Sequence, residues 1–143
     1  MHKDTICLLK ENDLGIKMAV GIFDEVIEEI SNCEMKKIIQ KSKEDHESLQ
    51  VEIENLLNSY SEDEKEPSLM AKSMSWMETN FKLMVDDTDN KVAEIVTNGC
   101  NMGTKTLSKK INEYKYADET SKQITKRLID LEDQLTLKLR KFL

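Results

Sequence analysis

The stretch from Asp4 to Ile30, DTICLLKENDLGIKMAVGIFDEVIEEI, decides the fold class, because its apolar residues recur at helical spacing. The steps alternate between three and four residues, which keeps the side chains on one stripe of an α-helix. This stripe consists of Ile6, Leu9, Asp13, Ile16, Val20, Phe23, Ile27 and Ile30. Only Asp13 breaks its apolar character. The pattern predicts a long amphipathic helix over residues 4–30.

The segment that follows predicts an abrupt reversal into a second helix. Ser31-Asn32-Cys33-Glu34 has the form of a capping box, in which Ser31 accepts from the backbone N–H of Glu34. A second helix is therefore expected over residues 33–60, antiparallel to the first because the connection is so short. Apolar stripes predict further helices over residues 67–85, 89–114 and 118–142. No stretch alternates with a period of two for long enough to form a strand.

The helix lengths predict how these elements are arranged. Four helices have about 25 residues each, or roughly 38 Å, whereas the helix over 67–85 is shorter. The economical arrangement is an all-α, up-down-down-up bundle of the four long helices. The helix over 67–85 is then a short extra crossover on its outside. The chain of 143 residues fits a single domain, residues 1–143.

Composition excludes several classes of protein. One proline and four glycines are too few for the turns of a sandwich or barrel of short strands. The net charge of −7, without an unbroken basic stripe, argues against nucleic acid as a partner. No segment reaches the roughly 18 apolar residues of a membrane span, and the N-terminus is not that of a signal peptide. Cys7 and Cys33 are expected about 39 Å apart, so reduced thiols and a cytoplasmic location are predicted.

Five residues stand out as candidate ligand-binding positions. Asp13 interrupts the apolar stripe of the helix predicted over 4–30, and Ser42 and His46 interrupt that of the helix predicted over 33–60. Cys100 lies in the middle of its predicted helix, and Glu132 is expected across from it. Each also has a structural interpretation: a hydrogen-bonded core histidine, a small buried thiol, or a carboxylate flanking a helix seam. Asp13 and His46 are expected about 7.5 Å apart along the bundle axis, which argues against a shared metal ion.

All four glycines fall inside predicted helices, where each costs about 0.5–1 kcal/mol relative to alanine. Gly99 and Gly103 lie within one turn of each other. We expect close packing of a bulky neighbour there, and the segment 67–85, which contains Trp76, is rich in such residues. The alternatives are space for a ligand, or a bulge in the helix.

The layout of helices resembles the ferritin-like superfamily, and in particular small bacterial domains similar to spore-coat and stress proteins. The segment from Pro67 to Leu143 carries most of this resemblance. Metal-dependent members of the superfamily have a Glu-x-x-His on each of two helices. In this chain Lys43 stands three residues before His46, and the last two predicted helices contain no histidine. The resemblance therefore implies the fold, but no di-iron site, no cofactor and no catalytic residue.

These observations predict a non-enzymatic helical module that acts in interaction or structure. It would self-associate as a dimer or bind another protein. The alternative is a metal- or small-ligand-binding protein, with possible redox activity, whose degenerate site uses the five candidate residues.

Overall fold

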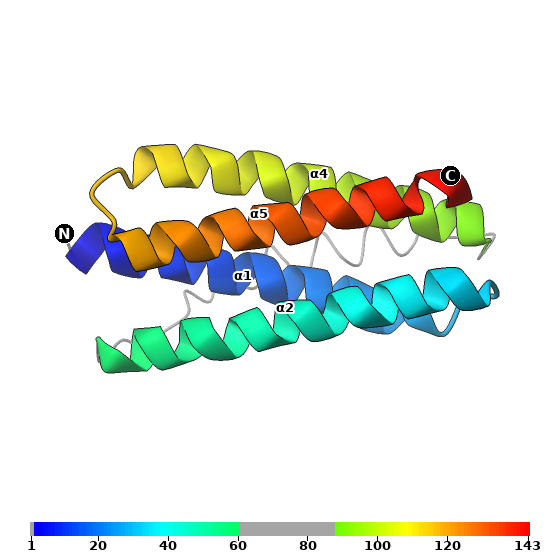
Figure 1. Ribbon diagram of the computed structural model, residues 1–143, viewed down its shortest axis with the longest axis horizontal. Coiled ribbons are helices and arrows are strands. Elements are labelled where there is room, and N and C mark those ends of the chain that lie inside the picture. Colours follow the sequence, from blue (N-terminus) through cyan, green and yellow to red (C-terminus); the bar gives the residue numbers. More distant parts are fainter. Residues whose placement is uncertain (1, 61–87) are drawn as a thin grey trace.

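The computed structural model describes residues 2–60 and 88–143. The helix predicted over 67–85 lies outside the described residues, and so does Trp76. The all-α prediction is confirmed for the described part of the chain, which contains helices and no strands. Its helices are α1 (His2–Ile27), α2 (Cys33–Ser59), α4 (Asp89–Glu113) and α5 (Glu119–Leu139), followed by the 3₁₀ turn η1 (Arg140–Phe142) (Figure 1). The corresponding predicted ends differ from these bounds by no more than three residues.

The cap of α2 differs from the prediction by one residue. Asn32, and not Ser31, is the N-cap, and its side chain accepts from the backbone N–H of Met35 at 3.0 Å. Asparagine and serine cap helices about equally well, so local preference does not choose between adjacent candidates. The backbone N–H of Ser31 instead donates to the carboxylate of Asp89. The other two caps are Thr88 for α4 and Asp118 for α5.

The four helices lie around a square in which every neighbouring pair is antiparallel. The hairpin α1–α2 packs against the hairpin α4–α5, with α1 beside α4 and α2 beside α5. In Figure 1 the colours show that α1 and α5 run in one direction, and α2 and α4 in the other. Consequently α2 finishes at the end of the bundle opposite to the one where α4 begins. Antiparallel neighbours place opposite ends of the helix dipoles side by side, which is the favourable arrangement.

Hydrogen bonds join the two hairpins at both ends of the bundle. At one end the carboxylate of Asp89 accepts from the backbone N–H groups of Ser31 at 2.9 Å and Asn32 at 3.0 Å. At the other end the backbone N–H of Tyr116 donates to the Asp4 carboxylate at 3.1 Å. The tight connections within each hairpin are therefore also contacts between the hairpins.

The apolar core is divided into two clusters along the bundle axis. The first cluster consists of Ile22, Phe23, Val26, Ile27, Ile30, Met35, Ile39, Val92, Ala93, Val96, Cys100, Leu135 and Leu139. The second consists of Leu9, Ile16, Leu49, Ile53, Leu57, Leu107, Ile124 and Leu128. Along α2 and α5, the residues between the two clusters include His46 and Glu132, which are both buried. The middle of the bundle thus contains polar side chains.

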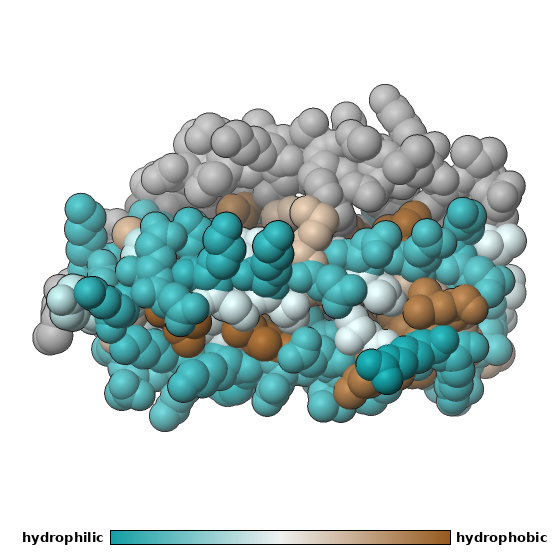
Figure 2. All heavy atoms as spheres, turned by 90° about the horizontal axis from the view of Figure 1, so that it is seen from above, coloured by the Kyte–Doolittle hydropathy of each residue, from teal (hydrophilic) through white to brown (hydrophobic). Residues whose placement is uncertain are grey.

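The outer surface is mainly polar. Figure 2, a view from the side of α4 and α5, shows that hydrophilic side chains dominate that face and that apolar atoms are visible between them. None of the helices in residues 2–60 and 88–143 combines the length and the apolarity needed to cross a membrane.

Candidate functional site

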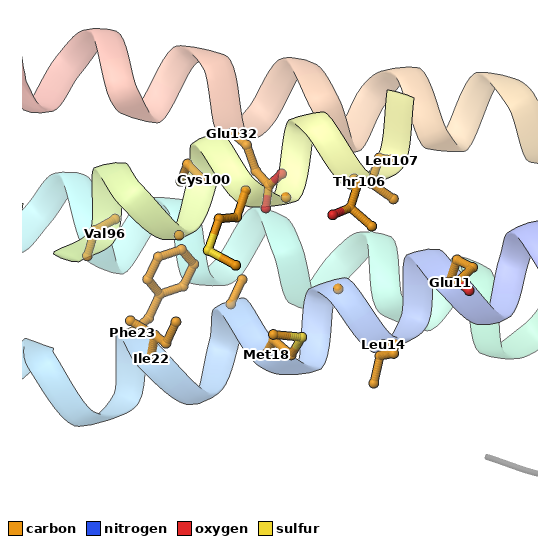
Figure 3. Close-up of a pocket in the computed structure, with 15 residues that line it drawn as sticks. Glu11, Leu14, Met18, Ile22, Phe23, Val96, Cys100, Thr106, Leu107 and Glu132 are labelled. Atoms are coloured by element: carbon orange, nitrogen blue, oxygen red, sulfur yellow. The ribbon is translucent and has the colours of Figure 1, made fainter. Parts of the chain in front are cut away.

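A pocket of about 130 Å³ lies between α1 and α4, and Glu132 of α5 reaches into it (Figure 3). Most of its lining is apolar. The residues on α1 are Glu11, Leu14, Gly15, Met18, Ala19, Ile22 and Phe23, and those on α4 are Val96, Gly99, Cys100, Met102, Gly103, Thr106 and Leu107. A cavity of about 150 Å³ is large enough to hold benzene. The pocket therefore matches the apolar part of a small molecule.

The carboxyl group of Glu132 is a buried polar group of this pocket, whose described lining also includes Glu11 and Thr106. Glu132 is 4% exposed, and its Oε2 atom has no hydrogen-bond partner within residues 2–60 and 88–143. A Cβ placed on Gly103 would lie 2.7 Å from Oε2 and 2.8 Å from Oε1, closer than real Cβ contacts come. Glycine at this position is thus what allows the carboxyl group to approach α4.

Burial raises the pKa of Glu132 to about 8, and the negative charge of Asp133 adds to the effect. The carboxyl group is consequently mostly protonated and neutral at pH 7. Burial also raises the pKa of the Cys100 thiol, with Glu132 and Asp133 adding to it, so Cys100 remains a thiol. Since the thiolate is the reactive form of cysteine, Cys100 acts here as a buried apolar wall and not as a nucleophile.

His46 and Ser42 lie in the core but do not line this pocket. The imidazole is fully buried, and its Nδ1 lies 2.7 Å from the carbonyl oxygen of Ser42. A carbonyl can only accept, so Nδ1 carries the hydrogen. Burial lowers the pKa of His46, although the Ser42 carbonyl opposes this shift. The ring packs edge-to-face on Phe23, with centroids 5.2 Å apart, and Phe23 is itself a wall of the pocket.

Asp13 is also placed away from the pocket. It is 4% exposed, and its Oδ2 accepts from Nζ of Lys17, one turn later on the same helix, at 2.5 Å. Its neighbour Asn12 is fully buried, and its Nδ2 donates to the Thr125 hydroxyl of α5 at 2.9 Å. This polar contact between helices was missed by the sequence reasoning, because Asn12 lies beside the apolar stripe and not on it.

The structure therefore brings together only part of the predicted set. Cys100, Glu132, Gly99 and Gly103 share the pocket, whereas Asp13, Ser42 and His46 lie elsewhere in the bundle. Within residues 2–60 and 88–143, no group of three or more His, Cys, Asp or Glu side chains is placed to hold a metal ion. The arrangement thus offers a largely apolar pocket with a neutral acid, Glu132, and no metal site among the described residues.

The α1 wall of the pocket was not predicted, although the sequence held a signal for it. Gly15 and Ala19 are small residues one turn apart on α1, as Gly99 and Gly103 are on α4. Among the described residues, no atom lies within 4 Å of a Cβ added to Gly15, so this position faces open space in that part of the chain. Small residues on both α1 and α4 leave the space between these helices. The residue pattern of one helix alone cannot reveal that space.

We expect Gly103→Ala to destabilise the protein by about 1–2 kcal/mol, because the added methyl group must displace a buried carboxyl group. In a Glu132→Ala background the same change should stabilise it by about 0.5–1 kcal/mol, the usual gain of alanine over glycine in a helix. Urea unfolding of the four proteins in this double-mutant cycle measures the coupling. Additive effects would contradict the contact between Glu132 and Gly103.

Comparison with known proteins finds no family model, no curated protein and no solved structure that matches this chain.

Proposed function

We propose that this protein binds a small, largely apolar molecule in the pocket between α1 and α4. The observation that carries the proposal is the Glu132 carboxyl group, which is buried in an apolar pocket with Oε2 unpaired and with Gly103 leaving room for it. A buried polar atom without a partner costs roughly 1–3 kcal/mol, which a ligand with a hydrogen-bonding group would recover. The unpaired Glu132 carboxyl group thus lowers the stability of the ligand-free protein, and a bound ligand would offset this loss.

The glycines strengthen this interpretation. Gly15, Gly99 and Gly103 each weaken their helix, and all three line the same pocket. Local features that oppose stability and gather at one place are typical of functional sites. Close packing explains Gly103, where the Glu132 carboxyl group fills the gap, but it does not explain Gly15, which faces open space.

Binding without catalysis is the form of the proposal that the chemistry supports. The pocket contains a thiol whose pKa is raised and a carboxyl group that is mostly neutral at pH 7, so neither is an activated nucleophile. We place this activity on a bundle of ferritin-like topology in the cytoplasm. The order and directions of the four helices support that topology. The expected role as an interaction module, with self-association, stays a prediction.

A panel of one-ring probes tests the proposal: toluene, benzyl alcohol and benzylamine. At least one of them should raise the midpoint of thermal unfolding of the wild-type protein. The effect corresponds to about 2.7 kcal/mol when the probe is a hundredfold above its Kd. Gly15→Leu, which extends a side chain into the open space, should fold and lose the effect. Ser48→Leu, on the exposed surface of α2, is the matched control and should keep it. Absence of any shift in the wild type, or an equal shift in Gly15→Leu, would exclude the pocket.

A further inference from the structure

We infer that the molecule bound in this pocket is an amphiphilic amine, whose apolar body fills the space between α1 and α4 and whose ammonium group pairs with Glu132. This inference rests on the proposed function and adds the charge of the ligand. Three observations carry it: the sign of the ionisable groups in the pocket, the position of the unpaired carboxyl oxygen, and the size of the apolar space.

The ionisable groups in the pocket favour a cation over an anion. Among its described lining residues the only side chains that can carry a full charge near neutral pH are Glu11 and Glu132, and none is lysine, arginine or histidine. Lys110 lies 3.7 Å from the Glu11 carboxylate, so the charge of Glu11 already has a counter-ion. Glu132 has no such partner. A ligand carboxylate or phosphate would find no cation among these lining residues to offset the cost of burying its charge.

The position of Glu132 suits a single charged head group. The carboxyl group of Glu132 projects from α5 to the space between Cys100 and Thr106 (Figure 3). It lies against Gly103 of α4. Oε2 is buried and unpaired, so a donor in the pocket can reach an acceptor that nothing else occupies. Hydrogen bonds between an ammonium group and a carboxylate are roughly twice as strong as those between neutral groups. An amine therefore gains more from this site than an alcohol of the same size.

The apolar walls determine the size and the polarity of the rest of the ligand. Apolar residues of the lining include Leu14, Met18, Ile22 and Val96. A volume of about 130 Å³ holds roughly one aromatic ring or a short alkyl chain. A polyamine with several charges would leave ammonium groups unpaired against these walls. The ligand class is thus a monoamine with one compact apolar group.

Binding of such a ligand must release a proton. The titratable groups beside Glu132 are Cys100 on α4 and Asp133 on α5. Burial and the negative charge of Asp133 keep the acid mostly protonated at pH 7. The amine arrives as an ammonium ion and keeps its proton. The carboxyl group then ionises to form the ion pair, and its proton passes to the buffer. The complex gains one positive charge from the ligand and loses one proton, so charge balances.

Isothermal titration calorimetry of the full chain at pH 7 tests this, with benzylamine, benzyl alcohol and benzoate as probes. We expect benzylamine to bind at least about tenfold more tightly than benzyl alcohol, and benzoate not to bind. In Glu132→Gln the preference for the amine should fall to near unity. It should persist in Asp133→Asn, a matched removal of one negative charge from the exposed neighbour. Repeating the titration in buffers of different ionisation enthalpy should show close to one proton released per benzylamine.

The outcomes separate this inference from the proposed function. Benzyl alcohol or benzoate binding as tightly as benzylamine would overturn the amine class and leave a small-molecule pocket in place. An amine preference that survives in Glu132→Gln would also overturn the inference. Failure of toluene and of every other probe to bind the wild type would overturn the proposed function itself. Circular dichroism of each variant shows whether the bundle is still folded, and Glu132→Gln removes a buried acid while nearly preserving the shape of the side chain.

Discussion

Replacing Glu132 by glutamine is expected to remove a pH-dependent loss of stability that the wild-type protein shows between about pH 4.5 and pH 8. Burial raises the pKa of Glu132 from its ordinary value of 4.5 to about 8 in the folded state. Between these values the folded state holds a proton that the unfolded chain has released. Stability then falls as pH rises, because ionising the buried acid costs free energy only in the folded state.

The wild type should therefore be close to Glu132→Gln in stability at pH 4.5 and weaker than it at pH 8, by on the order of a few kcal/mol. Urea unfolding at intervals of pH measures the difference between the two curves. His46 also makes stability depend on pH: its pKa is lowered in the folded state, so stability is lost as pH falls below 6.5. Both proteins contain His46, so its contribution cancels when one curve is subtracted from the other. Asp133→Asn should keep most of the slope, because burial is the main cause of the raised pKa of Glu132 and the charge of Asp133 only adds to it. Parallel curves for wild type and Glu132→Gln would show that the carboxyl group is not buried as described.

A second large effect is expected at Phe23, which forms part of both the core and the pocket wall. The residue is 1% exposed, and its ring packs on the edge of His46. Phe23→Ala should cost about 3–5 kcal/mol, because the lost apolar contacts and the new cavity both destabilise the folded state. Phe23→Leu should cost less, about 1–1.5 kcal/mol, since it keeps most of the volume.

Because Phe23 also lines the pocket, a small ligand should rescue its truncated variant, which is not expected at a core position away from the pocket. Truncation to alanine joins the new cavity to the existing pocket, so toluene should restore part of the stability of Phe23→Ala. The leucine variant should recover less. Denaturation with and without toluene measures both effects. A cost below about 1 kcal/mol for Phe23→Ala, or equal rescue of the two variants, would contradict this placement of the ring.

The sequence was sufficient to predict the four described helices, because each carries apolar residues in steps of three and four. The helix starts predicted at residues 33 and 89 agree with the structure, and the start predicted at Asp118 is one residue early because Asp118 is the N-cap of α5. The choice between Ser31 and Asn32 failed, because two good caps stand next to each other and the packing of the loop against Asp89 decides between them. The antiparallel direction within each hairpin follows from its short connection.

The extent of burial on each helix was harder to predict. A single stripe on α1 left out Asn12, which is fully buried, and included Val20, which is only partly buried. The physical reason is that α1 packs against α2, α4 and α5, so three faces of the helix are covered. The pocket could not be derived for a related reason. The pocket requires Gly15 on α1 and Gly103 on α4 to lie at matching levels along the bundle axis. This register is set by the packing of the helices and not by either helix alone.

The pairing of the four helices into two hairpins gives the pocket a mechanical role. One wall belongs to the first hairpin, through α1, and the other described lining residues belong to the second, through α4 and α5. A molecule seated there would act as a clamp between the two halves and would oppose any sliding or separation of one half from the other. A bound ligand would then stabilise the whole interface between the hairpins, including the bundle ends where carboxylates accept from backbone N–H groups. Amide hydrogen exchange at those ends would slow as the fraction of occupied pockets rises.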